Sequence, residues 1–376
     1  MMIFSLFLGI IVIWRGIWPL KISRKWKLVL AVIAGTVAFK FYILRFFGGK
    51  MFFTPELPGS VMLPATWLFA VLMFFSLWLI FSDVLGWTVK LYRYIRRKNG
   101  GKILFFNPVW RSSGLILLAI LVSIGMYYGL KVPDVTRKTL EIPRLPAELD
   151  GLKILHLTDI HVDPFTGSRK VDEIVKISNQ LLPDLVVITG DFVDGRVEVR
   201  GKDLAGLSKL HAPLGVFGVP GNHEYYSGYR QYLETLRGCG VRMLTNEHVR
   251  FGNSFVLGGV TDPAAKMKNE ELPDVGKTFM GAEPEIFKIL LAHQPKLADE
   301  AAANAVDLQL SGHTHGGMVW GLDILVGAFN KGRYSGEYEV GGMKLFISNG
   351  TGIWNGFPLR LGHRSEIVLL TLKRGR

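Results

Sequence analysis

The chain has 376 residues, and its 44 Lys and Arg outnumber its 31 Asp and Glu, for a formal net charge of +13 at pH 7. Residues 1–138 carry 18 of the basic residues against three acids, whereas residues 139–376 carry 26 against 28. The basic residues of the first part flank apolar runs, where they are better explained as topology signals beside anionic lipid than as a nucleic-acid surface, so no nucleic-acid partner is expected. The single cysteine, Cys239, excludes an internal disulfide framework and a cysteine-based zinc site.

Four apolar segments predict a bundle of about four transmembrane helices within residues 1–131. A helix needs about 20 apolar residues to cross the hydrocarbon core of a bilayer. Residues 61–82 and 114–130 carry no charge, whereas residues 28–44 contain Lys40 and residues 1–20 contain Arg15. We therefore expect spans at about 1–20, 28–44, 61–82 and 114–130, in contact with membrane lipids.

The loops between these segments predict the orientation of the chain. The first and third loops are strongly basic, whereas the second carries only Arg45 and Lys50 against Glu56. Because basic loops stay in the cytoplasm, the first and third loops are predicted to be cytoplasmic and the C-terminal part extracytoplasmic. Lys40, Arg45 and Asp83 lie in or beside spans, and we interpret them as anchors of helix ends rather than as a transport path.

A proline-containing juxtamembrane linker is expected over residues 132–149, followed by one domain over residues 150–374. In this domain short apolar runs bounded by turn residues alternate with helical patterns, which predicts an α/β fold. The predicted strands are 153–157, 185–188, 216–219, 255–260, 287–291, 308–310 and 344–348. The predicted helices are 171–182, 204–210, 229–236 and 297–303.

Five short motifs lie directly after five of these strands. In chain order they are Asp159-Ile-His161, Gly190-Asp191, Gly221-Asn222-His223-Glu224, Ala292-His293 and Gly312-His313-Thr314-His315. Functional sites in α/β sheets lie at the carboxyl ends of strands, so we expect the five loops to converge. Carboxylate, amide and imidazole groups together suit Mn, Fe or Zn, and two such metals close together hydrolyse phosphate esters.

These motifs, in this order, resemble those of the calcineurin-like metallophosphoesterases, over roughly residues 148–374. Segments 221–226, 292–295, 311–317 and 348–352 further resemble a membrane-linked bacterial subgroup, although Met318 stands where that subgroup would have a glutamine. The resemblance implies a four-layer α/β/β/α sandwich with two divalent metal ions (Mn, Fe or Zn) at the edge of the sheets.

The resemblance also implies a role for each residue of the motifs. One metal would be bound by Asp159, His161 and His315, the other by Asn222, His293 and His313, and Asp191 would bridge the two. His223 would not bind metal but would face the leaving-group oxygen as a general acid or charge stabiliser. Glu224 would orient the His223 imidazole or support the site from behind.

The remaining candidates are given structural roles. We interpret His156 as a core or supporting histidine, and Asp163 and Asp194 as loop carboxylates. Surface or loop positions are expected for His211, His248 and His363. For a group of aromatic residues, lining of a substrate groove and packing both stay open: Tyr225, Tyr226, Trp320, Trp354 and Phe357.

The leading interpretation is a membrane-anchored phosphoesterase that uses metal-activated water on a diester, a monoester or a pyrophosphate, with a lipid-linked substrate plausible because the site adjoins a membrane. One alternative is a UDP-sugar-lipid pyrophosphatase of envelope synthesis, whose cytoplasmic substrate conflicts with the predicted orientation. Another is a non-catalytic membrane sensor of metal or ligand, which the complete ligand set disfavours. A transporter with an accessory domain is a further alternative, disfavoured because no span carries a polar cluster that would line a pore.

Overall fold

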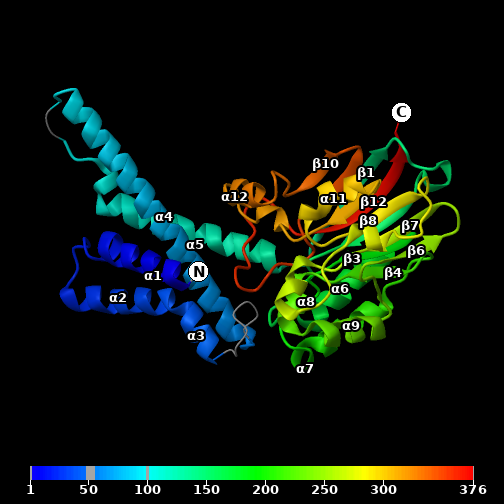
Figure 1. Ribbon diagram of the computed structural model, residues 1–376. Coiled ribbons are helices and arrows are strands. Elements are labelled where there is room, and N and C mark those ends of the chain that lie inside the picture. The colour runs from blue at the N-terminus through cyan, green and yellow to red at the C-terminus, as the bar shows by residue number, and fades with distance from the viewer. Residues whose placement is uncertain (1, 48–55, 99–100, 376) are drawn as a thin grey trace. The chain divides into compact units, whose positions relative to one another are not determined.

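The computed structural model describes residues 2–47, 56–98 and 101–375. Met1 of the predicted first span and Lys50 of the predicted second loop lie outside the described residues. The chain divides into two compact units, Met1–Met126 and Tyr127–Arg376. The division falls inside a long helix, so that the last turn of this helix belongs to the second unit. Figure 1 shows the elements of both units.

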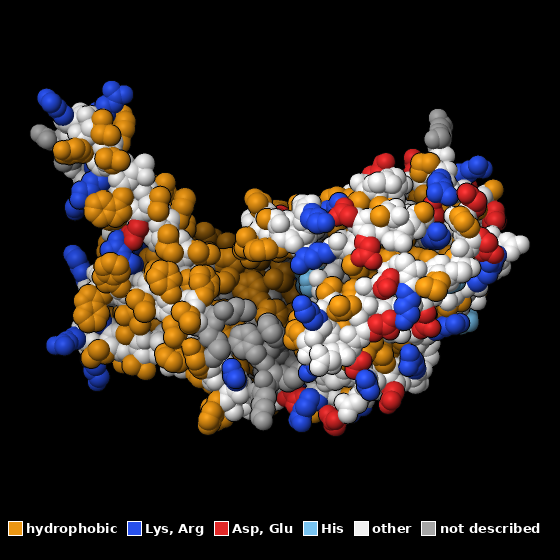
Figure 2. Space-filling view, viewed as in Figure 1, with side chains coloured by type: hydrophobic (Ala, Val, Ile, Leu, Met, Phe, Trp, Pro, Cys, Tyr) orange, Lys and Arg blue, Asp and Glu red, His pale blue; other side chains and the backbone are white. Residues whose placement is uncertain are grey.

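The first unit is helical. Its elements are α1 (Met2–Ile11), η1 (Val12–Ile17), α2 (Arg24–Ala38), α3 (Lys40–Phe47), α4 (Gly59–Ile95), η2 (Leu104–Phe106) and the greater part of α5 (Pro108–Leu130). Many large apolar side chains of these helices are exposed, and Figure 2 shows them covering the visible surface of this unit. A surface of this composition is suited to lipid rather than to water.

Each of the four predicted spans contains helix, but the count of four is not confirmed. Two helices, α4 and α5, are each long and apolar enough to cross a membrane. The α2 and α3 helices meet at a bend of 57° and add a third span only if they are counted as one. The apolar helix over residues 3–17 is short: 15 residues at 1.5 Å each reach about 22 Å, less than the ~30 Å hydrocarbon core.

The first unit contains an ion-pair cluster that the sequence interpretation did not foresee. Asp83 lies inside α4 and accepts two hydrogen bonds from Arg15, at 2.6 Å each, and one from Arg111. Asp83 is therefore held in an ion-pair cluster rather than serving as a helix-end anchor. Charges among apolar helices are stabilised when they are paired, so the cluster makes these residues compatible with the span of α4.

The second unit contains two six-stranded sheets among the described residues. The first has the order β1-β12-β2-β3-β4-β5 and the second the order β10-β11-β9-β8-β7-β6. The strands are β1 (Asp134–Ile142), β2 (Lys153–Leu157), β3 (Leu185–Thr189), β4 (Val216–Val219), β5 (Arg242–Met243), β6 (Glu247–Phe251), β7 (Phe255–Gly259), β8 (Phe287–Leu291), β9 (Leu308–Ser311), β10 (Gly336–Val340), β11 (Met343–Ile347) and β12 (Glu366–Arg374). The β2, β3 and β4 strands are parallel, as are β7, β8, β9 and β11.

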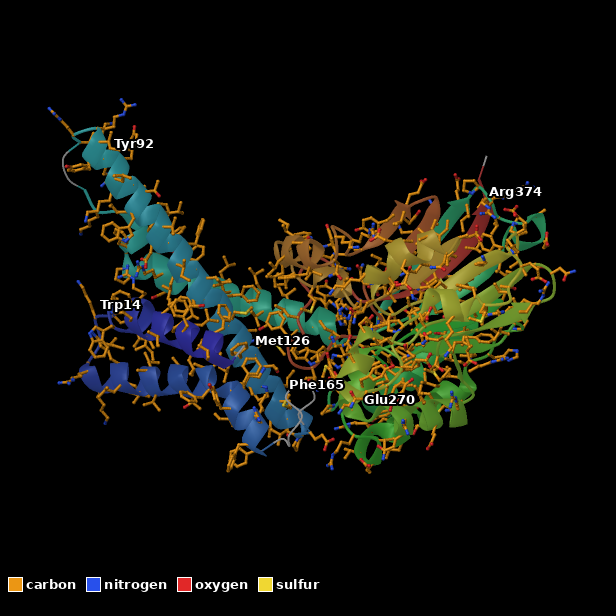
Figure 3. The ribbon with its side chains drawn as sticks, in the orientation of Figure 1. Trp14, Tyr92, Met126, Phe165, Glu270 and Arg374 are labelled. Atoms are coloured by element: carbon orange, nitrogen blue, oxygen red, sulfur yellow. The ribbon has the colours of Figure 1, made fainter. Side chains whose placement is uncertain are left out.

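Helices cover the outer face of each sheet, which gives four layers. The helical elements are η3 (Ala147–Leu149), α6 (Gly167–Gln180), α7 (Val197–Arg200), η4 (Gly201–Lys209), α8 (Asn222–Ser227), α9 (Tyr229–Gly238), η5 (Pro263–Lys268), α10 (Val275–Thr278), η6 (Pro295–Leu297), α11 (Ala298–Ala303), η7 (His315–Gly317) and α12 (Leu322–Phe329). One buried cluster joins inward side chains of both sheets, a second joins the first sheet to α6, η4 and α9, and a third joins the second sheet to α10 and α11. The predicted α/β/β/α sandwich is thus confirmed, and Figure 3 draws its side chains, with Arg374 marking the end of β12.

The prediction of a plain linker over residues 132–149 missed a strand. Nine consecutive residues form β1, which pairs in parallel with β12, and Leu140 and Ile142 of β1 are buried in the cluster between the sheets. The alternation of this segment is weak because β1 is an edge strand with exposed Arg137, Lys138 and Thr139. The β12 strand, which separates β1 from β2, was also missed.

Candidate metal centre

Every motif of the sequence prediction lies at the carboxyl end of a strand, and both sheets contribute. The β2, β3 and β4 strands of the first sheet lead to Asp159, Asp191 and Asn222, whereas β8 and β9 of the second lead to His293 and His313. All these side chains are buried or nearly so. The two parallel arrays therefore bring five loops to one place.

The backbone of these loops is held in a conformation that side chains rarely adopt. Twelve non-glycine residues among those described have a positive φ, and five of them are predicted metal ligands: Asp159, His161, Asp191, His313 and His315. Left-handed backbone at residues other than glycine concentrates at functional sites, because only the surrounding structure maintains it. The geometry thus singles out the same residues as the sequence motifs.

The first group of potential ligands consists of Asp159, His161 and His315, whose ligand atoms all lie within 4.8 Å of one another. The Nε2 atoms of the two imidazoles are 3.2 Å apart, and Oδ1 of Asp159 lies 3.4 Å from Nε2 of His315. Oδ2 of Asp159 accepts hydrogen bonds from Thr158 and from the amide of His313. Its buried Oδ1 has no hydrogen-bond partner among the described residues, as expected of an atom that binds a cation.

The second group consists of Asp191, His293 and His313, again within 4.8 Å, with Asn222 beside it. Nδ1 of His293 is 2.7 Å from the carbonyl of Thr189, to which it donates, which leaves Nε2 as the nitrogen that could bind a cation. That atom is 3.2 Å from three electron-rich atoms: Oδ1 of Asn222, Oδ2 of Asp191 and Nδ1 of His313. A divalent cation that displaced the Nε2 proton could be bound by all four atoms.

Asp191 lies between the two groups. Its Oδ1 accepts a hydrogen bond from the amide of His223 at 2.9 Å. Its Oδ2 is 3.2 Å from Nε2 of His293, in one group, and 3.7 Å from Nε2 of His161, in the other. This is the position that a bridging carboxylate would need, and the donor set suits divalent Mn, Fe or Zn.

The electrostatics of the centre favour positive charge. Burial lowers the pKa of His293, but Asp191 and further carboxylates outweigh it and raise this pKa to about 10. Burial likewise opposes protonation of His161, yet Asp194 and other carboxylates hold its pKa well above the ordinary value. Carboxylates that raise the pKa values of two buried imidazoles in this way would also attract divalent cations. The residues present therefore fit a metal-binding site.

His223 lies in a third group of potential ligands, with His161 and Asp194, in which it makes a hydrogen bond that the sequence interpretation missed. Its Nδ1 lies 2.5 Å from Oδ1 of Asp194, which also accepts from Nδ1 of His161 at 3.1 Å. Burial lowers the pKa of His223, but Asp191 and Asp194 outweigh it and raise this pKa above the ordinary value. Asp194 is thus not a plain loop carboxylate but holds two imidazoles of the centre.

The hydrogen bonds of Glu224 among the described residues go to backbone amides and not to the His223 imidazole. Its carboxylate accepts hydrogen bonds from the amides of Gly221, Asp191 and Phe192, at 2.7 to 3.0 Å. Burial, together with the Asp191 charge, raises the pKa of Glu224 to about 7. Glu224 therefore ties the loop after β3 to the loop after β4, and the predicted orientation of His223 falls to Asp194 instead.

Arg360 is a second residue that sequence reasoning missed. It is almost fully buried and donates hydrogen bonds to the carbonyls of His315 and Gly352, both at 2.7 Å. Its Nη2 atom also lies 3.1 Å from Nδ1 of His315. No motif marked it, because it is a lone arginine 45 positions from the histidine that it supports.

The other candidates take the places that follow. His156 is buried in β2 and lies 2.8 Å from the hydroxyl of Thr189, and Asp163 accepts hydrogen bonds within its own loop. Tyr225 is fully buried against Tyr229, whereas the Tyr226 and Trp354 rings lie 5.2 and 6.5 Å from the His223 ring. Of the remaining candidates, His211 and Trp320 are exposed, His248 and His363 are half-buried, and Phe357 is buried.

The chain is similar to several known proteins. The family model of the calcineurin-like phosphoesterases matches residues 152–317. A transmembrane protein with a metallophosphoesterase domain from Bos taurus is 31% identical over 97% of this chain and 86% of its own length. An uncharacterized metallophosphoesterase of Campylobacter jejuni is 33% identical over 82% of each chain. The crystal structure of the calcineurin-like phosphoesterase YfkN from Bacillus subtilis is 18% identical, with a TM-score of 0.37, over 54% of this chain and 82% of that chain.

The fold and the cluster of aspartate and histidine side chains define a metal-dependent hydrolase of phosphoester bonds. The chain belongs to the calcineurin-like metallophosphoesterase family. Its apolar helices and its similarity to transmembrane relatives associate it with a membrane.

Proposed function

We propose that the chain is a membrane-anchored phosphoesterase with a binuclear metal centre, which hydrolyses a diester, a monoester or a pyrophosphate. The observation that carries the proposal is the position of Asp191 Oδ2, at 3.2 and 3.7 Å from imidazole nitrogens of two separate ligand groups. Asp159, His161 and His315 would hold one cation, and Asn222, His293 and His313 the other. When bound, the two cations polarise the phosphoryl group and activate a water molecule.

The protein's own residues would prepare the reaction in three ways. Buried ligand side chains fix the place of the phosphoryl group and exclude bulk water. Asp194 accepts the Nδ1 proton of His223, so Nε2 of that ring is the nitrogen that faces the site, 4.0 Å from Oδ2 of Asp191. A protonated His223 would give its Nε2 proton to the leaving-group oxygen.

Two alternatives remain to be separated from this proposal. The non-catalytic sensor is disfavoured by the complete set of buried ligands together with His223 and its Asp194 partner. The UDP-sugar-lipid pyrophosphatase needs a catalytic part in the cytoplasm, whereas the basic first and third loops support an extracytoplasmic one. The proposed location is a cell membrane crossed more than once, with α4 and α5 among the spans.

The test is hydrolysis by the purified full chain, loaded with Mn²⁺, of bis-p-nitrophenyl phosphate and p-nitrophenyl phosphate, beside Asp191→Asn. We expect metal-dependent turnover that the substitution abolishes, and the preferred ester separates a diesterase from a monoesterase. Turnover that is unchanged in Asp191→Asn would contradict the proposal. Bound metal without turnover of any phosphoester would favour the sensor.

A further inference from the structure

Exposed apolar side chains gather at one place in the second unit. Trp320, Ile324 and Phe329 are 76%, 76% and 72% exposed, and Leu325 between them is also exposed. They belong to α12 and to the segment that leads into it. Apolar groups in this density are kept on a protein surface for contact with a partner or a membrane.

The charged residue of α12 does not interrupt this surface. Oδ1 of Asp323 accepts hydrogen bonds from the amides of Gly321 and Ile324, and its Oδ2 lies 3.1 Å from Nε2 of His363. The start of α12 packs closely on the loop that carries His315, since a Cβ at Gly317 would lie 2.3 Å from Cα of Asp323. The apolar surface thus adjoins the loop that carries His315 of the metal centre.

The same surface is connected to the end of α5 by contacts within the second unit. A Cβ at Gly129, in the last turn of α5, would lie 2.7 Å from the carbonyl oxygen of Pro358. The guanidinium of Arg364 lies 4.4 Å from the centre of the Tyr128 ring. Residues 358–364, which make these two contacts, also pair with the residue that precedes Gly321 and α12. The amide of Trp320 donates a hydrogen bond to the carbonyl of Leu361 at 2.9 Å.

These contacts set the level of α12 relative to a bilayer. The α5 helix is long and apolar enough to cross a membrane, and aromatic residues such as Tyr127 and Tyr128 concentrate at the membrane interface. Residues 358–364 contact that turn and are paired with Trp320, so Trp320 and the α12 helix that follows it are expected near the headgroups. Exposed Arg364 adds a positive charge suited to anionic lipid.

We propose that α12 and Trp320 form an interfacial surface that lies in the headgroup region of the bilayer in which the chain is anchored. The metal centre then acts on a phosphoester headgroup carried by a lipid of that bilayer, a consequence that rests on the proposed function. A helix of eight residues binds lipid weakly by itself, but the anchor keeps it at the surface permanently.

The surface is tested in the full chain, with Cys239→Ser as the background. Ile324→Cys and the equally exposed Leu182→Cys are labelled with an environment-sensitive fluorophore and reconstituted in vesicles of phosphatidylethanolamine and phosphatidylglycerol. We expect nitroxide-labelled lipid to quench the label at residue 324 by about half or more and to leave the label at 182 nearly unchanged. Equal quenching at both positions, or at neither, overturns the proposal. If the label at residue 324 is shielded in detergent, and the shielding increases with protein concentration, the surface binds a second copy of the chain and the proposal is overturned.

The substrate class is tested with Ile324→Glu/Phe329→Glu beside Leu182→Glu. The measured quantity is the rate on a phosphoester headgroup in vesicles divided by the rate on bis-p-nitrophenyl phosphate. We expect this ratio to fall about tenfold in the double variant and to stay at the parent value in Leu182→Glu. An unchanged ratio in both overturns the lipid-borne substrate. If the parent chain hydrolyses neither compound, the proposed function is contradicted. The quenching experiment still tests whether α12 and Trp320 lie in the headgroup region.

Discussion

Two imidazoles of the centre share one carboxylate oxygen, and they belong to a proposed metal ligand and to the proposed proton donor. Oδ1 of Asp194 accepts from His161 and from His223, and only His161 belongs to a predicted ligand set. The His223 ring lies beside Asp194 and the rings of Tyr226 and Trp354. Its predicted role is therefore open to a direct test.

We expect His223→Ala to retain both metals and to lose turnover by about 10²- to 10⁴-fold, the usual contribution of general acid catalysis. The reason is that its imidazole is hydrogen-bonded through Nδ1 to Asp194 and is not among the proposed ligands. Metal content by elemental analysis and kcat on bis-p-nitrophenyl phosphate check the prediction. Loss of a metal equivalent would instead make His223 a ligand.

Asp194→Asn keeps an oxygen that can accept from both imidazoles but removes the charge that stabilises protonated His223. We expect full metal content and a fall in kcat of about ten- to a hundredfold. Because the two residues act as a pair, Asp194→Asn combined with His223→Ala should be no slower than His223→Ala alone. If the fall in kcat of the double variant equals the product of the falls in the two single variants, Asp194 acts independently of His223. Asp172→Asn, an exposed carboxylate on α6, is the matched control.

The motifs located all seven proposed ligands because each ligand lies within a few residues of a strand end. Asp194 and Arg360 were not recognised, because their roles depend on which loop folds against them rather than on their neighbours in sequence. Of the two roles predicted for Glu224, support of the site from behind fits its carboxylate, which accepts hydrogen bonds from backbone amides of two loops.

At the scale of elements, several buried strands were predicted almost to the residue, whereas edge strands with an exposed face were missed, as was the largely buried β12 strand. The β2, β4 and β8 strands are buried and have the predicted bounds. The β1 and β10 strands lie at sheet edges, with exposed polar side chains that obscure their periodicity. The bend between α2 and α3 likewise has no proline or other signal in the sequence that would have predicted it.

The β1 strand should contribute to the stability of the second unit. Leu140 is fully buried between the sheets, so Leu140→Ala is expected to cost about 2–5 kcal/mol in free energy of unfolding. The neighbouring Thr139→Ala, at an exposed position, should change it by less than about 0.5 kcal/mol. Thermal unfolding of the full chain in detergent compares the two. Equal melting temperatures would mean that β1 is not part of the folded core.

At the scale of the whole molecule, the orientation in the membrane decides which substrates reach the centre. The basic loops predict an extracytoplasmic second unit, even though the count of four spans is not confirmed, because only α5 separates that unit from the third loop. An alkaline phosphatase reporter fused after Arg376 should be active in a bacterial host, and a green fluorescent protein fused there should be dark. The opposite pattern would place the centre in the cytoplasm and favour the nucleotide-linked lipid pyrophosphatase.

The most direct measurement is a titration of the chelator-treated full chain with Mn²⁺, in which bound metal and turnover of bis-p-nitrophenyl phosphate are followed together. We expect two equivalents to bind, with full activity only when both are present, and Asp191→Asn to remain inactive at every ratio. Full activity after a single equivalent, or two bound equivalents without hydrolysis of any phosphoester, would contradict the binuclear phosphoesterase.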